Sequence, residues 1–294
     1  MSWFRIVAAG VVLAVAVRSS VVCGDVIYKG DGTAGGLMPD VTQYQGQKNN
    51  GICAAAASAD VLWYIDQHGF DGLVAHQNKN KPNDTWKDDS KALVLDMANR
   101  IFGPKYVAGE GGPVGGLQKG LAEYIKSKHY YANTMDNTHD KGLVVQQYSA
   151  LQSTYQVWKQ FSGAEVDSAI GDFYWRDANN RDLTYTNNVG TVTTAHHAMT
   201  SAGYDTADKL TEVTMGWGDH PANLPPYKKP PYGAEEVPYF DEYSIRLSGP
   251  GTSKTMNIDK KEGVNLFNKV DAAKVVLDNF VGVRSLTRTW ERNC

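Results

Sequence analysis

The stretch that opens at Cys53 constrains the fold more than any other part of the chain. Four alanines, Ala54–Ala57, follow the cysteine, and Val61, Leu62 and Ile65 come next at the spacing of one helical face. Alanine is the best helix former, and Gly69 is placed where a helix can end. The pattern predicts a buried helix with Cys53 at its N-terminus, packed closely against its neighbours.

The overall composition is that of a globular protein. The chain has 294 residues, with 29 Lys+Arg against 32 Asp+Glu, a formal net charge of −3 and 42% hydrophobic residues. This balance excludes a basic surface for nucleic acid, so we expect no nucleic-acid partner. Three cysteines are too few for a small disulfide-built scaffold.

The first 24 residues have the pattern of a secretory signal peptide. Arg5 precedes the apolar run Ile6–Val17, and Gly24 is a small residue at the expected cleavage point. The run is shorter than the roughly 20 residues that span a bilayer, so we expect no membrane span and a secreted or periplasmic protein. Cys23 as a lipid-modified residue is an alternative.

Two cysteines, Cys53 and Cys294, follow the predicted leader, and two interpretations are open. They can pair in an oxidising compartment. Alternatively, the helix N-terminus stabilises a Cys53 thiolate, the reactive form of a nucleophilic cysteine. Gln47, just upstream, can then donate with the Cys53 amide to an oxyanion, although Gln43 and Gln45 show that glutamine is common in this polar stretch.

A second informative segment lies far downstream. The adjacent His196 and His197 begin a predicted strand that runs to Asp205, and Leu210–Met215 forms a second strand before Gly216-Trp217-Gly218-Asp219. Side chains alternate along a strand, so we expect only one of the two histidines to face a cleft.

These segments together resemble the papain-like cysteine peptidases, with some similarity to the streptopain-like bacterial branch. The resemblance rests on Gln47 and Cys53 opening a helix, on His197-Ala198 followed by Gly203-Tyr204, and on the later Gly-Trp-Gly corner. It implies an α+β fold of two lobes within one domain over residues 25–294, a helical lobe at about 25–145 and an antiparallel β lobe at 146–294. It also implies Cys53 as nucleophile, His197 as its proton partner, Gln47 as oxyanion donor, and His196 facing the other way.

The third catalytic position departs from the family pattern. Papain-like enzymes place an Asn or Asp where this chain has Thr214 or Met215, and Asp219 is the nearest carboxylate. Asp219 is equally consistent with an ordinary turn residue. A metal site built from His196, His197, Asp219 and His220 lacks the spacing of known zinc motifs, so we expect no metal and no cofactor.

The remaining segments are interpreted as scaffold and substrate surface. Helices are predicted at Asp89–Phe102 and Leu117–Lys128, and strands at Phe173–Trp175, Leu183–Thr194 and Tyr243–Leu247. The glycine-rich stretch 109–116 either lines a cleft or is a mobile surface loop. The proline- and tyrosine-rich stretch 220–240 either shapes access to the site or is a plain surface excursion.

The sequence therefore predicts a secreted cysteine peptidase that hydrolyses peptide bonds in a protein or peptide substrate. The stretch from Asp25 to Cys53 is too short for the inhibitory prodomain typical of that family. Two alternatives remain open. One is a catalytically inactive secreted binding protein that keeps the fold, and the other is an acyltransferase that uses the same Cys–His chemistry.

Overall fold

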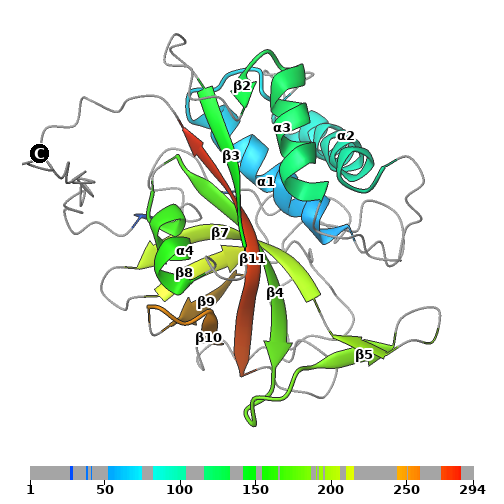
Figure 1. Ribbon diagram of the computed structural model, residues 1–294. Coiled ribbons are helices and arrows are strands. Elements are labelled where there is room, and N and C mark those ends of the chain that lie inside the picture. Colours follow the sequence, from blue (N-terminus) through cyan, green and yellow to red (C-terminus); the bar gives the residue numbers. More distant parts are fainter. Residues whose placement is uncertain are drawn as a thin grey trace, which may run out of the picture.

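The computed structural model describes two groups of elements, helices α1–α3 and a large sheet with helix α4 (Figure 1). The residues that it describes are 27–28, 38, 41, 52–74, 82–103, 116–132, 142–149, 154–164, 166–186, 190, 192–194, 196–205, 210–214, 244–249, 251–258 and 273–285. The mixed α+β class predicted from the sequence is confirmed.

Three helices pack together on one side of the sheet. They are α1 (Cys53–Gln67), α2 (Pro82–Phe102) and α3 (Leu117–Ser127). Gly69 adopts a φ of +98° just beyond α1, a conformation that favours glycine and ends the helix as predicted. Helix α2 begins at Pro82, a residue that suits the first turn of a helix, rather than at the predicted Asp89. The earlier start was not predicted because the residues of the first turns are mostly polar and show no apolar periodicity.

Strands β4, β7, β8, β9, β10 and β11 pair in a closed ring. Strand β4 pairs with both β7 and β11, and the path β7-β8-β9-β10-β11 completes the circuit with antiparallel neighbours throughout. The bounds of these strands are Ser168–Arg176, His196–Asp205, Leu210–Thr214, Ser244–Ser248, Thr255–Ile258 and Lys274–Ser285.

Three further strands extend the sheet at its margins. β1 (Ile27–Tyr28) pairs with β7, while β3 (Gly142–Tyr148) pairs with the far half of β11 and with β2 (Tyr131–Ala132). Strand β3 therefore crosses the boundary expected between residues 145 and 146. The predicted strand Leu183–Thr194 is instead a separate hairpin of β5 (Thr184–Thr186) and β6 (Val192–Thr194).

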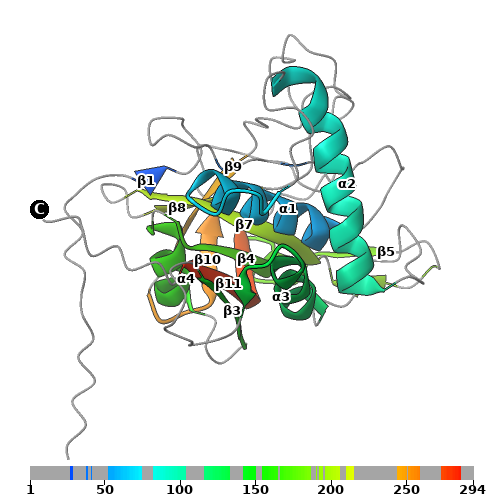
Figure 2. The same ribbon diagram turned by 90° about the horizontal axis from the view of Figure 1, so that it is seen from above.

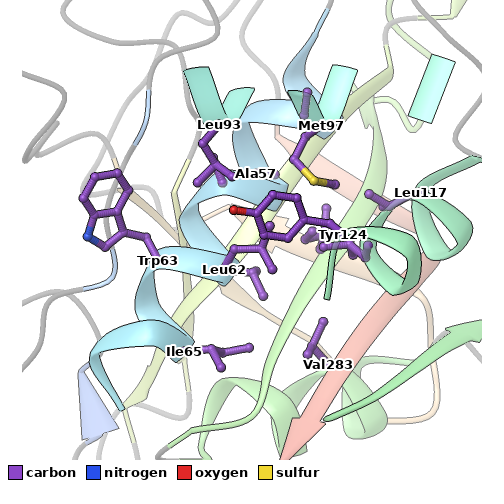
Figure 3. Close-up of a cluster of buried hydrophobic side chains, with 14 of the residues drawn as sticks. Ala57, Leu62, Trp63, Ile65, Leu93, Met97, Leu117, Tyr124 and Val283 are labelled. Atoms are coloured by element: carbon purple, nitrogen blue, oxygen red, sulfur yellow. The ribbon is translucent and has the colours of Figure 1, made fainter. Parts of the chain in front are cut away.

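Two hydrophobic cores lie on the two faces of the ring strands. Inside the ring, every one of the six strands contributes to an aromatic-rich cluster that α4 (Tyr155–Ser162) covers with Trp158 and Phe161. The other core joins α1, α2, α3 and the outer face of the sheet, as Figure 3 shows for Leu62, Met97, Tyr124 and Val283. Helix α1 lies over β7 in Figure 2 and contacts both β7 and β4.

None of the helices in the described part of the chain is long and apolar enough to cross a membrane.

Candidate functional site

Cys53 begins α1 at a helix end with no side-chain cap. The Ile52 carbonyl accepts hydrogen bonds from the Ala55 and Ala56 amides at 2.9 and 3.0 Å, and no acidic residue stands in the first turn. The amides of Cys53 and Ala54 point to the Cys53 sulfur. The start of the helix thus presents backbone donors to the thiol.

The thiol reaches a strand that is distant in the sequence. The Ala198 amide of β7 donates to Cys53 Sγ over 3.4 Å. Thr200 is the first residue of β7 that pairs with β8. Ala198 precedes it, and its only strand partner among the described residues is β4. Cys53 is a free, partly exposed cysteine. The contact places it at the junction of the helical group and the ring.

The groups around Cys53 shift the pKa of its thiol in opposite directions. Burial raises the pKa of the thiol, and the negative charge of Asp172 raises it further. The amides of Ala198, Ala54 and Cys53 lower the pKa but do not outweigh burial. The backbone amides at the helix N-terminus act in the expected direction but are opposed by burial and by Asp172, so the stabilised Cys53 thiolate stays a prediction.

The two histidines lie on opposite faces of β7, as the alternation rule requires. His196 is opposite Tyr174 and shares its face with Ala198 and Thr200, the face that α1 covers. His197 is buried, opposite Phe173, on the face that carries Met199 into the ring. The peptide bond that joins His197 to Ala198 supplies the amide that contacts Cys53.

His196 makes a polar contact with the neighbouring strand β4. Its Nδ1 lies 3.3 Å from Asp172 Oδ1, and this hydrogen bond raises the pKa of the imidazole against the opposing effect of burial. The side chain of His196 is half-exposed, whereas that of Asp172 is buried. The catalytic role assigned to His197 stays a prediction.

Two residues that were not predicted from the sequence, Asp172 and Asn279, also lie at this site. Asn279 Nδ2 donates to Asp172 Oδ2 over 3.3 Å from the neighbouring strand β11. A carboxylate inside the apolar strand that runs from Ile170 to Trp175 was the available signal, because an aspartate in a buried strand requires partners. Its partners come from elements more than twenty residues away and leave no local pattern.

Several predicted site residues lie outside the described residues. They are Gln47, Asp219, Met215, His220 and Cys294, and the same holds for the leader 1–24 and the stretch 220–240. Thr214 is the last residue of β8, where its backbone is paired with Thr200 and Ser244. The structure therefore brings together Cys53 and the His196–Ala198 segment.

Comparison of the chain with family models, curated proteins and solved structures gives no match. Within the described ranges, no three His, Cys, Asp or Glu side chains are grouped so that they could hold a metal ion. The chemistry of the site is therefore inferred from the chain's own residues.

Proposed function

We propose that this chain is a secreted cysteine peptidase of papain-like fold that hydrolyses peptide bonds, with Cys53 as nucleophile and His197 as its proton partner. The observation that carries the proposal is the contact between Cys53 Sγ and the Ala198 amide. It joins the start of a buried central helix to a histidine-bearing strand 145 residues away. A thiol at a helix N-terminus beside an imidazole is the arrangement that nucleophilic catalysis by cysteine requires.

The arrangement of the elements supports the two-lobe interpretation. The helices α1–α3 form one group, and the ring of strands with α4 forms the other. Cys53 belongs to the first group and the histidines to the second, so the thiol lies where the groups meet. A substrate bound at that junction would touch residues of both.

The proposed chemistry is that of a Cys–His pair. His197 takes the thiol proton, the Cys53 sulfur attacks the peptide carbonyl carbon and forms a C–S bond, and His197 gives the proton to the departing amine as the C–N bond breaks. Water then attacks the thioester while His197 accepts a proton from it, the C–S bond breaks to release the carboxylic acid, and the proton returns to the Cys53 sulfur. The Cys53 amide and Gln47 are the proposed donors to the oxyanion.

His197 is assigned rather than His196 because the two side chains have different surroundings. His196 is half-exposed and bound to Asp172, which leaves Nδ1 occupied. His197 is buried at the peptide bond that contacts the thiol. For this role the His197 side chain has to reach Cys53 from the ring-interior face of β7, past the Ala198 amide that contacts the thiol.

One observation favours the alternative of an inactive binding protein with the same fold. The pKa of Cys53 is raised, so the uncharged thiol predominates at neutral pH unless an imidazolium offsets the burial.

Labelling of Cys53 separates the two functions. A peptide-based irreversible thiol-directed inhibitor should modify Cys53 stoichiometrically, as mapped by mass spectrometry, and His197→Ala should slow the reaction more than His196→Ala. A wild-type protein whose Cys53 reacts no faster than a small free thiol would support the inactive binding protein. Equal loss in the two histidine variants would overturn the assignment of His197.

A further inference from the structure

A row of three polar side chains crosses β11, β4 and β7 on the face that α1 covers. Asn279 donates to one carboxylate oxygen of Asp172, and Nδ1 of His196 lies 3.3 Å from the other. Asp172 is buried, with only 6% of its surface exposed. A carboxylate buried to this extent is stable only when it is hydrogen-bonded or paired, and here each oxygen has a partner from a different neighbouring strand.

The strand register places Asp172 of this row close to the Cys53 thiol. Asp172 is directly opposite Ala198, and the Ala198 amide is the donor to Cys53 Sγ. The negative charge of Asp172 is one cause of the raised pKa of Cys53. A carboxylate near a thiol opposes loss of the thiol proton, and a cation bound to that carboxylate weakens the opposition.

Among the charged groups around the row, His196 is the one placed to offset the negative charge of Asp172. Asp278 of β11 and Asp182, which follows β4, also raise the pKa of His196, but Lys254 lies 3.8 Å from Asp278 and Arg176 lies 2.6 Å from Asp182. The first turn of α1 contributes no acidic residue. In the described part of the chain, His196 is the cationic side chain within ion-pair distance of Asp172.

We propose that His196 and Asp172 form a protonation-dependent charge pair that tunes the reactivity of the Cys53 thiol. While the imidazole is protonated, its charge offsets the carboxylate and the thiolate forms more readily. When the imidazole loses its proton, the carboxylate faces the thiol uncompensated and the thiolate is disfavoured. Asp172 and His196 are positioning residues that act on Cys53 through charge, and Asn279 fixes the carboxylate between them.

The pair also carries a stability signature with a defined sign. The folded-state pKa of His196 is raised, so its contribution to stability is fully present below the unfolded-state pKa and is lost as pH rises through the folded-state pKa. The reactivity effect and the stability effect therefore disappear in the same pH window.

The test is the rate of alkylation of Cys53 by iodoacetamide as a function of pH, measured on the full folded chain and assigned to Cys53 by peptide mass spectrometry. His196→Gln should slow the reaction by about three- to tenfold at pH values where the wild-type His196 is protonated, since one pKa unit corresponds to a tenfold change in thiolate. The difference should vanish at higher pH, where the wild-type imidazole is neutral too. Asp172→Asn should move the midpoint to lower pH. Adding His196→Gln to Asp172→Asn should then have little further effect, because no carboxylate remains to be offset.

Glu123→Gln is the matched control, because it removes one negative charge from an exposed pair on α3 and should leave the midpoint unchanged. The half-exposed His196 tolerates substitution, so His196→Gln gives a result even if Asp172→Asn fails to fold. Equal rates for wild type and His196→Gln at pH values where the wild-type His196 is protonated would overturn the proposal, as would a midpoint raised by Asp172→Asn.

The proposal rests on the proposed function, because it concerns the same thiol, but the alkylation test needs no peptide substrate. The predicted changes in alkylation rate in a protein that hydrolyses no peptide would contradict the peptidase and support the charge pair. Cys53-dependent hydrolysis with equal alkylation rates in wild type and His196→Gln would do the reverse.

Discussion

The two faces of strands β4 and β7 are built from different kinds of side chain. Inside the ring, Phe173, Trp175 and Met199 join an aromatic-rich core. On the face toward α1, the same strands present Ala198 and Thr200 beside Asp172 and His196. Large side chains fill a closed volume, whereas small ones let a helix approach closely enough for polar atoms to meet.

The close approach is visible in two contacts between α1 and β7. The Thr200 hydroxyl lies 3.2 Å from the Ala57 carbonyl and 3.1 Å from Asp60 Oδ2, and the Ala198 amide lies 3.4 Å from Cys53 Sγ. The alanines of the first turns of α1 have no side chain large enough to hold the strand away. The inner face therefore carries the aromatic packing, and the outer face carries the polar contacts around Cys53.

The largest expected effect is the loss of an aromatic side chain inside the ring. Phe280 is fully buried, stacks on Tyr148 at 4.4 Å and meets Trp158 edge-on at 5.6 Å. Phe280→Ala should lower the free energy of unfolding by about 3–5 kcal/mol, the usual cost of truncating a core aromatic residue. Chemical denaturation measures the loss. If the two faces are independent, Cys53 labelling in the folded fraction should be unchanged, and a parallel loss of labelling would show that they are not.

A smaller effect is expected from adding volume to the same face. A Cβ on Gly171 would lie 2.3 Å from the Phe173 ring and 3.0 Å from Leu277 Cδ1. Gly171→Ala should therefore destabilise the protein by about 1–3 kcal/mol through overpacking. Combining it with Phe173→Leu should recover part of the loss, as thermal unfolding would show. Strictly additive losses would mean that the ring of Phe173 is not what opposes the added methyl group.

The smallest stability effect belongs to the outer face. Thr200→Val keeps the shape of the side chain but removes the hydroxyl shared between Ala57 and Asp60, and it should cost about 1 kcal/mol. Because this contact holds α1 against β7, the same variant should alter the labelling rate of Cys53. Thr211→Val, which removes a hydroxyl bonded to the Leu247 carbonyl, is the control that should leave labelling unchanged. Equal labelling rates in both variants would separate the Thr200 contact from the site.

The sequence predicted those elements that have local signals. Helix α1 was predicted from its alanines, its apolar spacing and Gly69, and α3 from the stripe Leu117, Leu121, Ile125. Helix α4 and strand β11 were missed. The eight residues of α4 are too few to establish a helical period, and β11 is buried on both faces, so it lacks a polar and apolar alternation.

The candidate site was predictable only in part for the same reason. Cys53 and the two histidines stand in recognisable local patterns, so they could be predicted as site residues from the sequence. The Asp172–His196 and Asp172–Asn279 contacts depend on which strands pair and in which register, including the irregularity between Leu277 and Asn279. Which distant segments pair, and in which register, cannot be predicted from the local sequence of any one segment.

The most direct measurement of the central claim is hydrolysis of a mixed peptide library by the wild-type chain and by Cys53→Ala, read by mass spectrometry of the products. Alanine is the commonest residue at the start of α1, so the variant should unfold at nearly the same temperature as the wild type. The wild type should cleave the library and Cys53→Ala should not. Cleavage retained by Cys53→Ala would contradict the assignment of Cys53 as the nucleophile.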